Sequence, residues 1–268
     1  MKELLYLYCV TKEKPASGGL DDLGVKICPV LFSGMCAVLS RVSPDDFSEE
    51  NLKKHLADMG WVERNIRLHE KVIEAIMKEQ SVLPFKFGTV FESEANVERL
   101  LRDNGAEFKA TLARLEGQEE WGLKIYCEGE FFKEALCGKN ERVIEVDQEI
   151  ASASLGKAYL LKKKREEIII DITNETISEC TRDCYESLKA ASEDTRINKL
   201  LPQEVTEKKE AMVLNAAFLI SSKRIQEFEA ILARLKADYA GQGLIFDCTG
   251  PWPPYNFCDS LRKQTSHG

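Results

Sequence analysis

MVLNAAFLISSKRIQEFEAILARLKADYAGQGLIFDC, residues 212–248, decides the fold class of this chain. Its first nine residues place apolar side chains at every second position, which is typical of a strand with one buried face. Residues 225–239 then carry apolar side chains at helical spacing, and Gly241 and Gly243 end that helix before the apolar run 244–248. The stretch therefore predicts a strand, a helix and a second strand.

A further strand opens this half of the chain, because residues 121–127 also alternate between two faces with period two. Residues 131–191 between these strands have a helical pattern. We expect a break at residues 138–140 and a weaker one in the β-branched run 168–172, which together favour a helical hairpin. Strands and helices in this order indicate a ferredoxin-like α/β sandwich with a long helical insertion.

The first half begins with three apolar runs, at residues 4–10, 27–32 and 35–42. Each is short and rich in strand-forming residues. The last two are separated only by Ser33 and Gly34, which predicts a hairpin with a two-residue turn.

Two amphipathic helices follow, at residues 61–79 and 94–115, and they flank the strand-like run 82–91. Proline cannot donate a hydrogen bond to a sheet, so Pro84 predicts either an edge strand or the entry to a strand. Gly88 indicates a bulge or bend in the same run.

These patterns predict an α+β protein made of two α/β domains. We expect an N-terminal α/β domain at residues 1–118 and a C-terminal ferredoxin-like domain with a helical hairpin at residues 119–249. Residues 250–268 form a tail rich in proline and aromatic residues. We expect this tail to pack on the second domain or on a partner.

Composition excludes several functional classes. A net charge of −8 over 268 residues is unlike a nucleic-acid-binding protein, which carries a basic surface. The sequence contains neither a membrane-length apolar run nor a secretory signal, and no phosphate-binding glycine motif. We therefore expect a cytoplasmic chain with no nucleic acid, membrane or small-molecule substrate as partner and no cofactor.

Nine scattered cysteines lack any CxxC pair, which favours reduced thiols. Cys180 and Cys184 could offer two metal ligands from one helix face, but core packing is the favoured interpretation and no metal is expected. They share one helical stripe with other residues, which are Leu155, Tyr159, Thr173, Ile177, Leu188 and Ala191.

His69 lies on the apolar face of the helix at residues 61–79. A histidine in that position is more often packed and hydrogen-bonded than catalytic, so we expect it to be buried and structural. The alternative is a ferredoxin-like enzyme that uses His69, Glu70 and Lys86. A deep polar pocket that joins these three residues would favour the enzyme.

Two segments resemble a known family. Residues 82–91, VLPFKFGTVF, are similar to a VLP-x-RFGTVF segment, and residues 249–257, TGPWPPYNF, are similar to a TGPWPPY-x-F segment. The start LYLY at 5–8, the pair His69-Glu70, and GKAYLL at 156–161 stand in the same order as in that family. The chain thus resembles the gas vesicle GvpL/GvpF family over nearly its whole length. Lys86 departs from the usual arginine, and Cys9 from a frequent glycine.

The resemblance implies a non-enzymatic gas vesicle assembly or minor structural protein, located at the gas vesicle. Its implied partners are the small apolar shell-forming protein and other gas vesicle proteins. The candidate interaction or family-motif residues are Pro84, Lys86, Phe87, Gly88, Trp252, Pro253, Tyr255 and Phe257.

Overall fold

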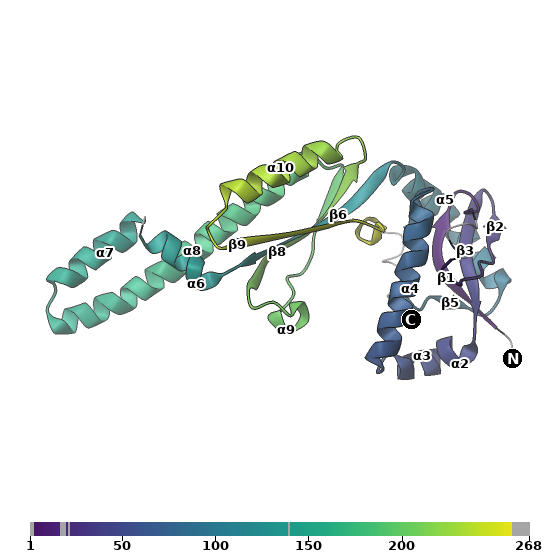
Figure 1. Cartoon of the computed structure of the whole chain (residues 1–268), viewed down its shortest axis with the longest axis horizontal. Helices are drawn as coiled ribbons and strands as arrows, with labels where there is room; N and C mark the ends of the chain where they lie inside the picture. The colour runs from purple at the N-terminus through teal and green to yellow at the C-terminus, as the bar shows by residue number, and fades with distance from the viewer. Residues whose placement is uncertain (1–2, 17–19, 21, 139, 259–268) are drawn as a thin grey trace. The chain divides into compact units, whose positions relative to one another are not determined.

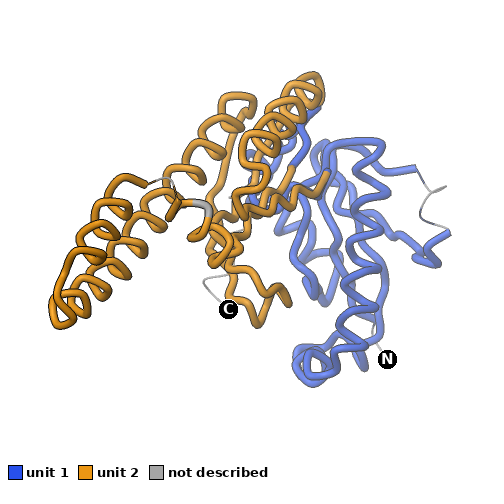
Figure 2. The backbone as a smooth tube through the Cα atoms, turned by 60° about the vertical axis from the view of Figure 1, so that its left-hand side comes forward, with its two compact units in different colours: residues 1–120, 251–268 blue, residues 121–250 orange. Residues whose placement is uncertain are grey.

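The structure is a computed structural model that describes residues 3–16, 20, 22–138 and 140–258 (Figure 1). The chain divides into two compact units (Figure 2). Unit 1 contains residues 1–120 and 251–268, and unit 2 contains residues 121–250. The division thus falls two residues after the predicted boundary, and the C-terminal segment is part of unit 1 instead of a separate tail.

Unit 1 contains a sheet in the order β2-β3-β1-β4, with β5 paired to β1. Its strands are β1 (Leu4–Thr11), β2 (Val30–Phe32), β3 (Met35–Val42), β4 (Val82–Pro84) and β5 (Val90–Phe91). The predicted hairpin is confirmed, because Phe32 pairs with Met35 and both turn residues, Ser33 and Gly34, have positive φ. The predicted edge strand is confirmed as well, since β4 ends the sheet and its Pro84 pairs with Cys9.

Helices cover both faces of this sheet. They are α2 (Pro44–Phe47), α3 (Glu49–His55), α4 (Met59–Met77) and α5 (Glu94–Arg114). Cys36 belongs to the core cluster that includes α4, whereas its neighbour Met35 lies against Gly105 of α5. Successive strand residues point to opposite faces, so α4 and α5 lie on opposite sides. Accordingly, β1 is buried from Leu5 to Thr11.

Unit 2 contains a four-stranded sheet in the order β7-β8-β6-β9. Its strands are β6 (Gln118–Cys127), β7 (Asp194–Ile197), β8 (Ala211–Ser221) and β9 (Leu244–Trp252). Its helices are α6 (Gly129–Cys137), α7 (Glu141–Ser152), α8 (Leu155–Lys189), α9 (Gln203–Thr206) and α10 (Ile225–Asp238). Both sheets of the chain are antiparallel, and the mixed helix and sheet class is confirmed. The ferredoxin-like assignment of unit 2 stays a prediction.

The helical hairpin of unit 2 differs in detail from the expected one. The chain breaks at residues 138–140 as predicted, but the second break lies at Ala153 and Ser154. Residues 168–172 stay helical within α8, because packing against α7 outweighs the weak helix propensity of β-branched residues.

The stripe predicted to be core along α8 is buried at only one end. Cys180 and Cys184 are buried as expected, with Cys184 in the core cluster of unit 2. Leu155 and Tyr159 are 95% and 61% exposed, which corrects the prediction for the first turns of the helix. With 35 residues, α8 is about 50 Å long, so it extends beyond the sheet on which its other end packs.

Candidate functional site

A hydrogen-bond network centred on His69 links three parts of unit 1. His69 lies on α4 and is 1% exposed. Its Nε2 is 3.0 Å from the carbonyl oxygen of Phe85, and its Nδ1 is 2.9 Å from the hydroxyl of Tyr6. A carbonyl only accepts hydrogen bonds, so Nε2 carries the proton and Nδ1 accepts from Tyr6. The Tyr6 oxygen in turn accepts from the backbone N–H of Gly88 at 3.1 Å.

This environment keeps His69 neutral. Burial lowers the pKa of His69 to about 4, although the bond to Phe85 acts in the opposite direction. The ring stacks on Tyr8 and meets the edges of Tyr6 and Phe87. The predicted burial of His69 is therefore confirmed. A base with so low a pKa and two committed nitrogens is poorly suited to proton transfer near pH 7.

The C-terminal segment completes the network through Tyr255. Its hydroxyl is 3.1 Å from His69 Nε2 and donates to Oε1 of Glu70 at 3.0 Å. Burial raises the pKa of Glu70, and the bond from Tyr255 partly offsets that rise. Tyr255 also packs against the core cluster on the α4 side of the sheet.

The segment at residues 82–91 contributes backbone atoms to the network and buries most of its first side chains. Pro84 is buried, Phe87 is half-buried, and Lys86 is exposed. Gly88 has a φ of +82°, a conformation that disfavours other residues, and a Cβ there would lie 3.0 Å from Leu52. The turn thereby directs the Gly88 N–H at Tyr6 while Lys86 faces solvent.

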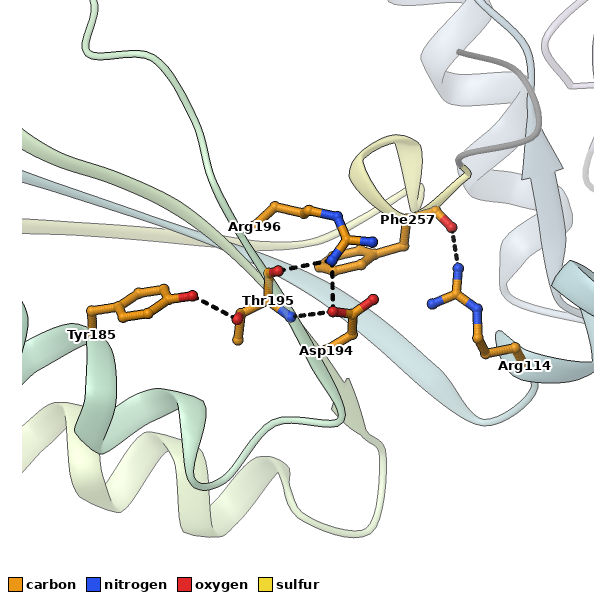
Figure 3. A network of polar contacts seen from close by, with 6 residues as sticks. All are labelled: Arg114, Tyr185, Asp194, Thr195, Arg196 and Phe257. Carbon is orange, nitrogen blue, oxygen red and sulfur yellow. Dashed lines mark hydrogen bonds and ion pairs between the residues drawn. The ribbon is translucent and has the colours of Figure 1, made fainter. Parts of the chain in front are cut away.

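Residues 251–258 pack on unit 1, which corrects the expectation that the tail packs on the second domain. Asn256 donates to both carboxylate oxygens of Glu120, at 3.0 Å from its backbone and 2.6 Å from its side chain. Arg114 donates to the carbonyl of Phe257, whose side chain is fully buried (Figure 3). Pro253 is also buried, whereas Trp252 is 42% exposed. Sequence patterns contain no signal for partners so distant along the chain.

A cavity of about 610 Å³ lies beside the network in unit 1. Apolar and aromatic groups line most of it, and its polar lining includes Tyr8, Ser40 and His69. The hydroxyls of Tyr8 and Ser40 bond to each other at 3.1 Å. The cavity has the size of a small-ligand pocket.

The three residues of the enzyme alternative do not share this cavity. His69 lines it, but Glu70 and Lys86 do not. Within the described residues, no group of three histidine, cysteine or acidic side chains is placed to hold a metal ion. None of the nine cysteines, all of which lie in the described part of the chain, is paired in a disulfide.

A separate polar network belongs to unit 2 (Figure 3). Tyr185 of α8 bonds to the hydroxyl of Thr195 at 2.7 Å, and Arg196 pairs with Asp194 at 2.7 Å. These contacts join α8 to the edge strand β7. Strand β7 is not predicted from the sequence, because its four residues lack an apolar alternation.

Comparisons with known proteins give one consistent result. The family model described as "Gas vesicle synthesis protein GvpL/GvpF" matches residues 4–259. Gas vesicle protein L of a Streptomyces species is 29% identical, over 95% of this chain and 92% of that protein. Gas vesicle protein L1 of Halobacterium salinarum is 26% identical, over 96% of this chain and 91% of that protein.

Solved structures agree in fold. The crystal structure of the gas vesicle protein GvpF from Anabaena matches with a TM-score of 0.71 at 19% identity, over 96% of this chain and 98% of that chain. The GvpF structure from Microcystis aeruginosa matches with a TM-score of 0.64, also at 19% identity, over 96% of this chain and 99% of that chain. Among the described residues, no helix is both long and apolar enough to cross a membrane.

Proposed function

This chain belongs to the GvpL/GvpF family of gas vesicle synthesis proteins, and from this premise we propose that it binds the small apolar shell-forming protein during vesicle assembly. It acts without catalysing a reaction, either as an assembly factor or as a minor structural component. An apolar shell subunit aggregates unless its apolar surface is covered before incorporation. A protein that covers it transiently would supply that protection.

The observation that carries this proposal is the meeting of four family-motif segments in unit 1. The start of β1, the pair His69-Glu70, residues 82–91 and residues 251–258 are joined by the hydrogen bonds around His69. Their buried members hold unit 1 together. Lys86 and Trp252 are the members of these segments that we consider for partner contact, because both are exposed.

Trp252 is the best anchor for an apolar partner. It is 42% exposed, and a tryptophan that becomes buried in an interface often dominates the binding energy. Phe87 is half-buried and adds apolar surface on the same segment as Lys86. We propose that these three residues contact the shell protein, in the cytoplasm or at the growing vesicle.

A binding experiment with purified shell protein tests the proposal. Trp252→Ala in the full chain is expected to weaken binding at least tenfold. Leu31→Ala is the matched control, because Leu31 is a 64% exposed apolar residue of unit 1 outside the family motifs. Equal binding by both variants would show that Trp252 is not the contact, and no binding by the wild type would refute the function itself.

The enzyme alternative finds less support in the geometry. Both nitrogens of His69 are committed to neighbours, and the adjacent cavity is not lined by Glu70 or Lys86. We therefore place His69 and Glu70 among the residues that hold unit 1 together.

A further inference from the structure

The cavity of about 610 Å³ in unit 1 is lined by aromatic rings that pack against one another. The ring centroid of Tyr6 lies 4.8 Å from that of Tyr8 and 5.1 Å from that of Phe47. His69 stacks on Tyr8, and Phe87 meets His69 edge to face. Such a lining favours a planar aromatic ligand, because its rings can stack on these side chains or meet their edges. The volume is in the range of pockets that hold small organic molecules.

The buried and half-buried polar groups of this lining are neutral. Burial raises the pKa of Tyr8 and the pKa of Cys28, and it lowers the pKa of His69 to about 4, so all three are uncharged near pH 7. The lining residues that carry a charge are exposed, and they are Glu3, Lys26 and Arg41. An uncharged ligand is therefore favoured, since a buried charge without a partner costs free energy.

One hydroxyl proton beside the cavity has no acceptor among the described residues. The hydroxyls of Tyr8 and Ser40 are 3.1 Å apart, and both residues are 5% exposed. Their hydrogen bond uses one of the two O–H protons, and within the described part of the chain neither side chain makes another hydrogen bond. Each hydroxyl can donate as well as accept, so the pair has one further proton to donate. A buried donor without an acceptor is unfavourable, and a ligand with an acceptor would satisfy it.

We propose that this cavity binds a small, uncharged, planar aromatic molecule that carries a carbonyl group or a similar hydrogen-bond acceptor. Its rings lie among the aromatic lining residues, and its acceptor atom takes the remaining proton of Tyr8 or Ser40. His69 contributes only its ring, because both of its nitrogens are committed to the protein. The site does not involve Trp252, so it adds ligand binding to unit 1 independently of the proposed contact with the shell protein.

Prodan, a fluorescent naphthyl ketone, is a suitable probe because it is neutral, planar and carries one carbonyl group. We expect it to bind the full chain saturably, with a shift of its emission to shorter wavelength. Three competitors of similar shape define the ligand class. Acetylnaphthalene should displace prodan, whereas isopropenylnaphthalene, which has a methylene group in place of the carbonyl oxygen, should bind about tenfold more weakly. Naphthoate should also bind about tenfold more weakly, because its carboxylate must lose water.

A double variant tests the hydroxyl pair. Tyr8→Phe with Ser40→Ala removes both O–H groups together, so neither partner is left unpaired and the fold should be retained, which thermal unfolding checks. We expect prodan to bind this variant about tenfold more weakly than the wild type. Each single change leaves one O–H proton free to donate and should weaken binding by less than about threefold. A general loosening of the cavity would not produce this pattern.

Cys28 provides a second readout from the cavity itself. It lines the cavity and is half-buried, whereas Cys137 and Cys248 are half-buried and do not line it. Saturating prodan should slow the reaction of Cys28 with an uncharged maleimide and leave the rates at Cys137 and Cys248 unchanged. Mass spectrometry of the peptides measures the three rates in one sample.

Equal prodan binding by the wild type and the double variant would overturn the proposal, and so would equal protection of all three cysteines. Equal binding of naphthoate and acetylnaphthalene would contradict the uncharged ligand class. Absence of saturable binding would show that the cavity holds only water. Trp252→Ala should leave prodan binding unchanged, and the double variant should still bind the shell protein. Failure at the cavity and failure at Trp252 are therefore separate results.

Discussion

The hydroxyl of Tyr255 donates a 3.0 Å hydrogen bond to Oε1 of Glu70, although 185 positions separate the two residues. This bond joins the end of the described chain to α4 in the first half. Unit 2 is consequently inserted between two parts of unit 1. Unit 1 reaches its full set of contacts only when the C-terminal segment has been synthesised.

Tyr255→Phe tests how much this bond stabilises unit 1. The change removes the donor to the half-buried Glu70 carboxylate and leaves the ring in place. We expect a loss of about 1 to 2 kcal/mol in the free energy of unfolding, measured by urea denaturation. Tyr159→Phe, at a 61% exposed position, should change stability by less than about 0.5 kcal/mol. Equal stability of the two variants would show that the bond to Glu70 contributes nothing net.

The low pKa of His69 predicts an acid-sensitive fold. The unfolded chain takes up a proton on this residue near pH 6.5, whereas folded His69 resists protonation until about pH 4. Neutral His69 therefore contributes its full share to the free energy of unfolding above pH 6.5. That contribution, up to about 3 kcal/mol, is lost as the pH falls toward 4. Glu70 acts in the opposite direction, since its raised pKa favours the folded state on acidification.

Comparison with His69→Gln isolates the histidine contribution. Denaturation at several pH values between 7 and 4.5 should give a steeper loss of stability for the wild type than for the variant. Parallel pH profiles would show that His69 is protonated equally in both states, contrary to the buried network.

Two glycines near the start of β9 should differ in their tolerance of alanine. Gly241 and Gly243 both have positive φ, at +72° and +79°. A Cβ on Gly243 would lie 3.2 Å from the backbone nitrogen of Phe132 and 3.3 Å from the carbonyl of Glu128, whereas nothing lies within 4 Å at Gly241. Gly241→Ala should cost about 1 kcal/mol from backbone strain, and Gly243→Ala about 1 to 3 kcal/mol more. Thermal unfolding of both variants provides the measurement, and equal losses would contradict the predicted collision.

The local sequence pattern predicts most helices, strands and turns, because the formation of each depends mainly on residues close together in the chain. The turn at Ser33 and Gly34 and the edge position of Pro84 follow from backbone chemistry alone. His69 was predicted to be buried because its neighbours on α4 are apolar. The helix at residues 225–239 was visible in its spacing, and the structure has α10 at Ile225–Asp238.

The surfaces on which these segments pack could not be predicted in the same way, because they are formed by residues distant in the sequence. Leu155 and Cys184 share one helical stripe, and periodicity alone cannot show where the covering sheet ends. The partner of Asn256 is Glu120, and no local feature of either residue indicates the other. Proline and aromatic content showed only that residues 250–257 would pack, and the surface that receives them depends on the tertiary fold.

Removal of residues 255–268 tests the assignment of the C-terminal segment to unit 1. The truncation leaves β9 intact, because that strand ends at Trp252. It removes the fully buried ring of Phe257, the two bonds of Asn256 to Glu120 and the Tyr255 hydroxyl. Burial of one large aromatic side chain contributes about 1.5 to 3 kcal/mol, so the combined loss should exceed about 3 kcal/mol.

The loss should be confined to unit 1. Hydrogen exchange is expected to speed up at β1 and α4, while β8 and α10 keep their protection. If the segment served only as a contact surface for a partner, the truncated chain would melt like the wild type and lose shell-protein binding alone. Unchanged stability would therefore refute packing on unit 1, because a fully buried phenylalanine and a glutamate that is 5% exposed cannot lose their partners without cost.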